Sequence, residues 1–529
     1  MLTLSMMMAG AVCARAQAAS EVGPTAGGAG GRGRILLVLP FDNRTGQPSL
    51  EWIREAAPEI LGSRFSSAGF APMSRADRLY ALDHLGLPQG FQPSRASSLK
   101  LAQTLDADSI VVGNYVTDGN SIVAEAWLVD VPHLRMSEPV TARGEMRNLL
   151  AVFDSLAWKL TRQLDPGFSV AEETFVAASA GLRLDAFEQY IRGITEPDQA
   201  ERLRHLNQAV LLSPAYGRAW MALGREDYVG QQYEQAAAAF AKVNRNDPDA
   251  LEAGFYRGLS LLFSGDYPKA EEVFGGVART LPLAEVLNNQ GVAVSRRGRD
   301  GSALFRQAVA ADPNAADYHF NLAVSLKRHG DATEALTELA QCLKLRPNDS
   351  EAQGLQAAWK TPAAGLDKEA MAEPLERIVR SFDAVAFRQA ASMLDQMEAA
   401  RLAQLKPHER AQKLAVQAKD YLSRGLLLEA ERLYLSAVAV DGAVAEAHAG
   451  LAEVRERTGD AVAARKEATI SLELLPSADA YLVLGRLDLA AGHADLAAHE
   501  AGEALKLDPK DKAAQELSRQ IEAKDAQKK

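Results

Sequence analysis

The sequence predicts an α+β protein in which a small α/β domain precedes an all-α superhelix of repeated helical hairpins. Prolines and glycines recur about one helical hairpin apart through the C-terminal part of the chain. Residues 34–166 instead alternate short apolar runs with amphipathic stretches, as strands and helices do. Hydrophobic residues make up 47% of the chain but aromatic residues only 6%, which suits closely packed helices rich in Ala and Leu. At 529 residues, more than one domain is expected.

The N-terminal end has the composition of a signal peptide. The apolar run MLTLSMMMAGAV is followed by Ala14-Arg15-Ala16 and Ala16-Gln17-Ala18, two small-x-small cleavage sites. It is atypical because no Lys or Arg precedes Arg15. We expect residues 1–18 to be a signal peptide and the mature protein to be periplasmic or otherwise extracytoplasmic in a bacterium. The position of the true start codon stays open.

Residues 19–33 are expected to form a flexible Gly-rich linker. Their GAGGRG segment matches G-x-G-x-x-G, but it precedes a strand instead of opening a helix, so it does not predict dinucleotide binding.

Residues 34–166 have the pattern of an α/β domain. The continuous apolar run RILLVLPF predicts a strand buried on both faces. Thr117–Asn120 contains Asp-Gly, a strong hairpin signal, and the alternation in residues 121–129 predicts a half-buried strand. The expected strands are 34–41, 69–73, 109–115, 121–129 and 136–142, and the expected helices are 50–65, 99–105 and 145–164.

This part of the chain resembles a known domain family. The segments ILLVLPFDNRTG, SRADRL and LAQTLDADSIVVGNYVTDGNSIVAEAWLVD are similar to the TolB-like N-terminal domain, which is related in pattern to the CsgG and FlgO groups of bacterial envelope proteins. The resemblance covers roughly residues 34–165 and departs from the family at VPHLRMSEPV. It implies a small βα sandwich without established catalytic residues and an assembly or accessory role in the cell envelope.

The remainder of the chain is organised by a repeat. Pro214, Pro248 and Pro282 are 34 residues apart, and Pro347 follows Pro313 by 34. Gly442, Pro476 and Pro509 continue the spacing at 34 and 33. Several units also carry a small residue on the first helix and a large one on the second, such as Gly258 and Phe274. This pattern is typical of the tetratricopeptide repeat, in which each helical hairpin stacks on the next and a closing Pro ends the second helix.

The spacing divides the chain into segments. Residues 183–350 are expected to form a first array of about five repeats, and residues 411–511 a second array of about three. Residues 351–410 break the period and are expected to form a helical joint, with helices at Leu375–Val379 and Phe387–Leu405. Residues 512–529 are expected to be a capping helix and tail, which terminal repeats need for solubility.

No sequence motif points to chemistry. The chain lacks H-E-x-x-H, G-x-S-x-G and G-x-x-x-x-G-K-[ST], and its nine histidines are scattered. A formal net charge of −11 argues against nucleic-acid binding by the protein as a whole. We therefore expect no enzyme activity and no catalytic, cofactor-binding or metal-binding residues. The oligomeric state stays open.

The expected site is the concave face of the repeats, where the first helix of each unit meets a protein or peptide partner. Apolar residues in the middle and cations at both ends predict a peptide with apolar anchors and some negative charge, bound extended or as a helix. An alternative for Phe255, Leu259 and Leu262 is that they pack against neighbouring units. The expected partner-binding residues are Arg218, Met221, Arg225, Tyr228, Phe255, Leu259, Leu262, Asn288, Arg296, Phe320, Lys327 and Arg328.

Two functions agree with this pattern. The first is a non-enzymatic cell-envelope scaffold or adaptor that binds protein or peptide partners on its repeats, with peripheral association with the envelope left open. The alternative is a sensor in which the N-terminal α/β domain binds a small molecule and the repeats relay the signal. A pocket of convergent polar groups in residues 34–165 would favour the sensor, and a filled core would favour the scaffold.

Overall fold

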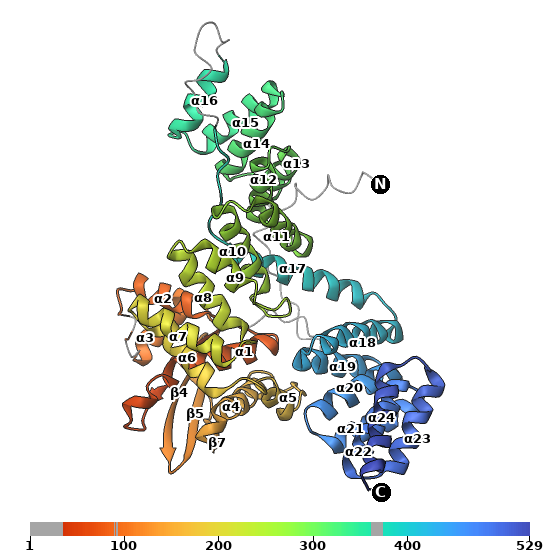
Figure 1. The fold of residues 1–529 in the computed structure, drawn as a ribbon. Helices are drawn as coiled ribbons and strands as arrows, with labels where there is room; N and C mark the ends of the chain where they lie inside the picture. The colour runs from red at the N-terminus through yellow and green to blue at the C-terminus, as the bar shows by residue number, and fades with distance from the viewer. Residues whose placement is uncertain (1–34, 89, 91–93, 361–373, 529) are drawn as a thin grey trace. The chain divides into compact units, whose positions relative to one another are not determined.

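The computed structural model describes residues 35–88, 90, 94–360 and 374–528. The signal peptide and linker expected at residues 1–18 and 19–33 lie outside this part of the chain. The fold class is α+β, as predicted: a small α/β domain is followed by a helical repeat array (Figure 1).

A mixed sheet forms the centre of the N-terminal domain. Strands β3, β1 and β4 run parallel, whereas β5 is antiparallel to β4 and pairs in turn with β6 and β7. The β4–β5 hairpin turns at Gly119, whose φ of +59° favours glycine. The strands are β1 Ile35–Val38, β2 Asp42–Asn43, β3 Ala71–Pro72, β4 Ser109–Asp118, β5 Ser121–Asp130, β6 Arg135–Met136 and β7 Val140–Glu145.

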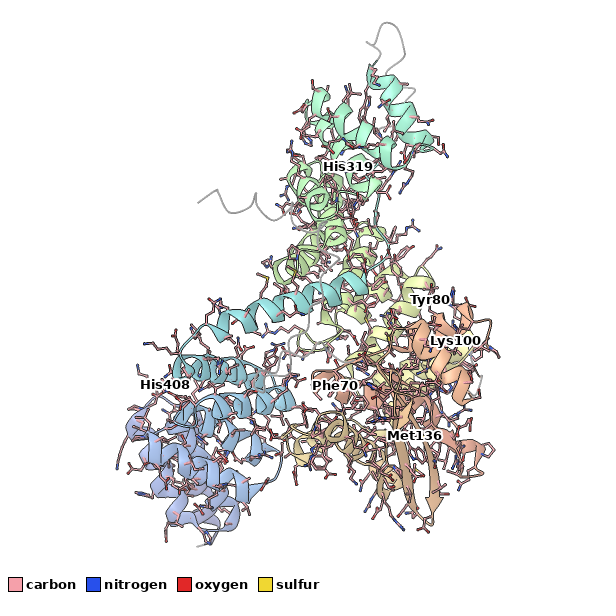
Figure 2. The ribbon with its side chains drawn as sticks, turned by 180° about the vertical axis from the view of Figure 1, so that it is seen from behind. Phe70, Tyr80, Lys100, Met136, His319 and His408 are labelled. Carbon is pink, nitrogen blue, oxygen red and sulfur yellow. The ribbon has the colours of Figure 1, made fainter. Side chains whose placement is uncertain are left out.

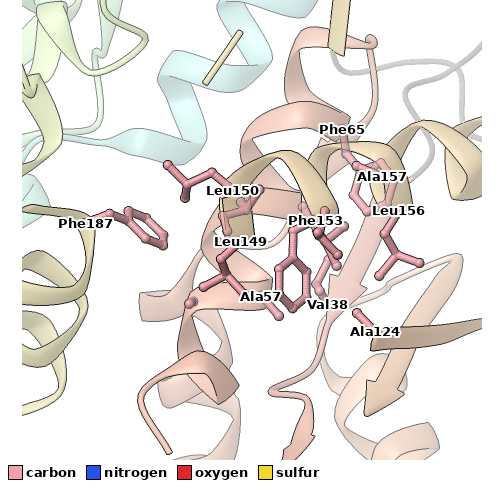
Figure 3. Packing of buried hydrophobic residues seen from close by; sticks show 14 of the residues in the cluster. Val38, Ala57, Phe65, Ala124, Leu149, Leu150, Phe153, Leu156, Ala157 and Phe187 are labelled. Carbon is pink, nitrogen blue, oxygen red and sulfur yellow. The ribbon is translucent and has the colours of Figure 1, made fainter. Parts of the chain in front are cut away.

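Helices cover both faces of this sheet, which explains why β1 is apolar throughout. Leu36 and Val38 pack in a cluster with helices α1 and α4, whereas Leu37 packs on the opposite face with α2 and α3. Figure 3 shows Phe153 of α4 beside Val38 of β1 and Ala57 of α1. The helical elements here are η1 Pro48–Leu50, α1 Ile53–Ser67, α2 Arg75–His84, α3 Arg95–Thr104, η2 Met146–Asn148, α4 Leu149–Leu164 and α5 Glu172–Ala177.

The repeat region consists of helical hairpins, in each of which two successive helices pack side by side (Figure 1). The five hairpins of the first array, called array 1, are α6 Leu184–Thr195 with α7 Gln199–Leu212, α8 Gly217–Val229 with α9 Tyr233–Phe240, α10 Ala250–Phe263 with α11 Tyr267–Thr280, α12 Ala284–Arg296 with α13 Ser302–Ala311, and α14 Ala316–Arg328 with α15 Ala332–Leu345. Two further helices follow, α16 Ser350–Lys360 and α17 Ala384–Ala403. The three hairpins of array 2 and its last helix are α18 Pro407–Ser423 with α19 Leu427–Val440, α20 Ala445–Arg457 with α21 Ala461–Leu474, α22 Ala478–Ala491 with α23 Ala494–Leu507, and α24 Lys512–Lys528.

A glycine facing a phenylalanine holds the two helices of a hairpin close together. A β-carbon placed on Gly258 of α10 would lie 2.6 Å from the ring of Phe274 on α11. The same pairing recurs between Gly224 and Phe240 in the preceding hairpin. The small residue on the first helix and the large residue on the second therefore pack directly against each other.

Gly258→Ala is expected to lower the stability of the chain, whereas Gly502→Ala is expected to raise it. Both substitutions replace a helical glycine by alanine. Taken alone, this replacement stabilises the folded chain by about 0.5–1 kcal/mol. A β-carbon added at Gly258 would contact the Phe274 ring, whereas nothing lies within 4 Å of a β-carbon added at Gly502. The overpacking at Gly258 costs about 1–3 kcal/mol of stability. Melting temperatures from calorimetry would check this, and equal shifts for both variants would contradict it.

A second recurring contact joins the closing residue of one unit to the first helix of the next. The side chain six positions after the Pro or Gly that closes a unit donates an N–H to the backbone carbonyl oxygen of that closing residue. The pairs are Trp220 to Pro214 at 2.9 Å, Gln353 to Pro347 at 2.7 Å and Gln515 to Pro509 at 3.0 Å. Histidines take this role at His319, labelled in Figure 2, and at His448. The contact fixes the turn between successive units.

The ring of His448 lies between two acceptors. Its Nε2 is 3.1 Å from the carbonyl oxygen of Gly442, and its Nδ1 is 2.7 Å from Oε2 of Glu467. Only the imidazolium can donate to both acceptors at once. The hydrogen bond to Glu467 accordingly raises the pKa of His448, against the opposing effect of burial.

The stabilisation of array 2 by His448 is expected to decrease with rising pH. A raised pKa in the folded state stabilises fully below the unfolded value of about 6.5, and the effect is lost as pH rises through the folded value. His448→Gln retains a donor for the Gly442 carbonyl, as Gln353 and Gln515 do for theirs, but does not titrate. Wild type should exceed this variant by up to about 1.5 kcal/mol at pH 5.5, and by less at pH 8.5. Thermal unfolding at a series of pH values measures the difference, and parallel curves would refute the assignment.

Candidate peptide-binding groove

The first helices of array 1 hold a segment of the same chain in an extended conformation. Residues 374–383, called the groove segment, contact α10, α12 and α14. The helix expected at Leu375–Val379 is wrong, because this stretch has no helical structure. Its backbone groups bond to side chains of the array instead of to one another.

Two asparagines bind this backbone from successive first helices. Asn321 of α14 donates to the carbonyl of Arg377 at 2.7 Å and accepts from its N–H at 2.6 Å. Asn289 of α12 makes the same two bonds to Val379, at 2.7 and 3.0 Å. Asn288 also donates to the Arg377 carbonyl, at 3.1 Å, and all three amides are fully buried. Since they bind peptide groups, these amides recognise an extended chain whatever its sequence.

Glu376 enters a cationic pocket. Its side chain is 1% exposed, and its carboxylate accepts from Arg328 and from the hydroxyl of Ser295, each at 2.5 Å. Nε of Arg296 lies 3.4 Å from the same carboxylate, and Nη2 of Arg296 donates to the Glu376 carbonyl at 3.1 Å. The pocket therefore selects a negative charge at this position.

Arg377 enters an adjacent anionic pocket. Its guanidinium lies 3.6 Å from the ring centre of Phe320 and donates to Asp349 at 2.6 and 2.9 Å, with further bonds to Asp317 and Glu351. Burial alone would lower the pKa of Arg377, but the bonds to these carboxylates outweigh it and raise the pKa. The bond from Arg377 lowers the pKa of Asp349 in turn.

The C-terminal end of the groove segment is aromatic. The ring of Phe382 lies 5.5 Å from that of Phe255 on α10, and the guanidinium of Arg380 lies 5.1 Å from the ring centre of Phe263. The N–H of Asp383 donates to Glu285 at 3.1 Å. The groove thus provides charged pockets from α12, α14 and the start of α16, an amide clamp from α12 and α14, and an aromatic platform on α10.

The residues expected at the partner site fall into two groups. Phe255, Asn288, Arg296, Phe320 and Arg328 contact the groove segment. The others are paired or packed elsewhere in the array, or share a hydrophobic cluster with the groove segment.

Two of that second group are cations paired within the chain: Arg218 with Glu59 of α1 at 3.3 Å, and Arg225 with Glu252 at 2.5 Å. Lys327 lies over the ring of Trp359. Met221 packs among the helices of the array. Leu259 and Leu262 belong to a hydrophobic cluster against which Tyr228 and Phe382 of the groove segment both pack.

Several groove residues were not anticipated from the sequence. They are the polar groups that complete the pockets: Asn289, Asn321, Ser295, Asp317, Asp349, Glu351 and Glu285. One signal was available, because Asn289 and Asn321 are each the sixth residue of a first helix. A buried amide recurring at one position of a repeat indicates a bound polar group.

Other kinds of site have no counterpart in the part of the chain that the structure describes. No group of three His, Cys, Asp or Glu residues there is arranged to hold a metal ion. No helix among those same residues is long and apolar enough to cross a bilayer.

Comparison with known proteins supports the repeats. The tetratricopeptide repeat family matches residues 221–284, 297–358 and 416–479. No curated protein matches the chain.

Similar solved structures include YrrB, a tetratricopeptide protein with an unusual peptide-binding site, at 16% identity over 38% of this chain and 99% of YrrB, with a TM-score of 0.29. MamA from Desulfovibrio magneticus RS-1 is 21% identical over 34% of this chain and all of its own, with a TM-score of 0.28. The LpoB C-terminal domain from Salmonella enterica is 18% identical over 22% of this chain and 84% of its own, with a TM-score of 0.19.

Proposed function

We propose that this chain is a non-enzymatic scaffold of the bacterial cell envelope that binds extended segments of partner proteins in the groove of array 1. The observation that carries this proposal is the paired binding of backbone N–H and C=O groups by Asn289 and Asn321. Main-chain bonds of this kind provide affinity for an extended peptide, and the flanking pockets provide selectivity. A peptide partner also agrees with the presence of tetratricopeptide repeats.

The packing of the N-terminal domain favours a scaffold over a small-molecule sensor. The space between the sheet and helices α1 and α4 is filled by fully buried aromatic rings, among them Phe41, Phe65 and Phe153. Phe41 and Phe153 pack edge to face with ring centres 5.7 Å apart. A filled core of this kind suits a domain that binds through its surface.

The envelope location rests on the sequence. The signal-peptide pattern of residues 1–18 and the resemblance of residues 34–165 to TolB-like domains both support a periplasmic protein. Fractionation of cells carrying a C-terminally tagged chain, with mass spectrometry of the mature N-terminus, tests this. Cleavage within residues 14–19 and recovery from the periplasm support it, and an uncleaved chain in the cytoplasm would overturn it.

The binding role is tested by co-purification from envelope fractions. Asn289→Ala/Asn321→Ala removes the amide clamp, whereas Asn207→Ala/Asn314→Ala removes two exposed asparagines elsewhere in array 1. Partners identified by mass spectrometry should be lost with the first pair and kept with the second. Partners that remain bound to the clamp variant at wild-type levels would exclude the groove as the binding site.

A further inference from the structure

We propose that the groove of array 1 selects an extended peptide with the order Glu-Arg-x-Val-x-x-Phe, and that the groove segment is a built-in competitor that such a partner displaces. This rests on the proposed peptide-binding function and names the chemistry of its ligand. Glu376, Arg377, Val379 and Phe382 of the groove segment supply the pattern, and the Val379 side chain packs against the hydrophobic cluster of Leu287, Ala308 and Tyr318.

The bonds that Asn289 and Asn321 make to the groove segment use hydrogen-bonding groups that only a bound backbone satisfies here. At the sixth position of the first helix, α12 and α14 carry Asn289 and Asn321, but α20 and α22 of array 2 carry Gly450 and Val483. These two hairpins of array 2 therefore stack with small or apolar residues at this position. Asn321 and Asn288 bond to each other between α14 and α12 at 2.8 Å, but that bond uses only part of their hydrogen-bonding capacity. A buried polar group without a partner costs about 1–3 kcal/mol, so the bound backbone explains the remaining groups of Asn289 and Asn321.

The two charged pockets fix the order of the recognised residues. Glu376 lies against Arg296 and Arg328, and the next residue, Arg377, lies against Asp317 and Asp349. Exchanging the two charges would place like charges together in both pockets. Because these side chains are mostly shielded from water, the repulsion is not screened as it would be at an exposed surface.

The groove segment occupies the site as a tethered ligand. Both ends belong to the same chain, so its effective concentration at the groove is on the order of millimolar. A free peptide with the same contacts must exceed this concentration to compete. Binding by a partner is therefore weak until the groove segment is released or the partner makes additional contacts.

Binding of a labelled peptide to the full-length protein tests the proposal. The probe is a fluorescent peptide of residues 374–383, PLERIVRSFD, followed by anisotropy. Arg377→Glu in the protein should release its own groove segment and tighten binding of the probe at least about tenfold over wild type. Adding Asn289→Ala/Asn321→Ala should abolish this gain, and the exchanged peptide PLREIVRSFD should bind at least about tenfold more weakly than the probe.

Hydrogen exchange on the wild-type chain gives a second readout that needs no variant. Saturating PLERIVRSFD should accelerate exchange of the Arg377 and Val379 amides, while α12 and α14 stay protected. Unchanged protection together with no binding by the Arg377→Glu protein would show that the groove segment is a fixed strap, and would overturn the proposal. If envelope partners still require Asn289 and Asn321 in that case, the binding function stands and only the competitor is excluded.

Discussion

Glu376→Lys is expected to expel residues 374–383 from the groove and expose Arg377 and Arg380 to trypsin. The glutamate side chain is 1% exposed and lies against Arg296 and Arg328. A lysine there would leave three cations together with no anion between them. Breaking a buried ion pair costs about 3–5 kcal/mol, and each 1.4 kcal/mol changes an equilibrium about tenfold. The equilibrium constant for holding the groove segment in place should therefore fall by a factor of at least about 100.

Limited proteolysis followed by mass spectrometry would measure this release. In wild type, the backbone at Arg377 and Val379 is held by asparagine amides and should resist cleavage. Glu446→Lys makes the same charge reversal at an exposed position of array 2 and should leave the cleavage pattern unchanged. Equal resistance at Arg377 in the Glu376→Lys protein would mean that the ion pairs do not hold the groove segment.

The parts of the fold that could be predicted from the sequence are those fixed by local pattern. The apolar run beginning at Arg34 predicted a strand buried on both faces, and β1 has Leu36 on one face and Leu37 on the other. The spacing of prolines predicted the hairpins because each Pro ends a second helix. The small residue at Gly258 and the large one at Phe274 were recognisable because they meet within a single repeat.

The groove segment could not be predicted because its conformation depends on residues distant in the sequence. LERIV contains good helix formers, which favour a helix over Leu375–Val379. The amides of Asn289 and Asn321 instead provide bonds to an extended backbone from about 90 and 56 positions away. Tertiary contacts therefore override local propensity at this segment.

The burial of the predicted site residues also depends on residues distant in the sequence. A position on a first helix follows from the repeat period, so Asn288, Arg296, Phe320 and Arg328 could be assigned to the concave side. The depth of each side chain depends on the neighbouring unit. Leu259, for example, is fully buried in the hydrophobic cluster against which Phe382 packs, so its depth follows from its neighbours and not from its place in the repeat.

Arg64→Met is expected to destabilise the N-terminal domain by about 3–5 kcal/mol at neutral pH, the usual effect of breaking a buried pair. Nε of Arg64 on α1 lies 2.8 Å from Oδ1 of Asp154 on α4, and the Asp154 side chain is fully buried. Burial raises the pKa of Asp154, and Arg64 opposes that rise. Without Arg64, the carboxylate would be left in the core with its charge uncompensated.

The pH dependence of this loss has a defined sign. Removing Arg64 raises the folded pKa of Asp154 further above its unfolded value of about 3.9. An acid whose pKa is raised on folding destabilises progressively as pH rises from the unfolded value toward the folded one. The deficit of Arg64→Met relative to wild type should therefore be smaller at pH 5 than at pH 8.

Denaturant unfolding followed by tryptophan fluorescence measures these differences, because Trp52, Trp127 and Trp158 all lie in the N-terminal domain. Arg44→Met removes an exposed arginine and should change stability by less than about 0.5 kcal/mol. Arg64→Met/Asp154→Leu should regain most of the lost stability, since replacing both members of a buried pair with apolar residues is often neutral or favourable. A double variant as unstable as Arg64→Met would instead show that Arg64 stabilises the domain by packing between α1 and α4 and not by compensating the Asp154 carboxylate.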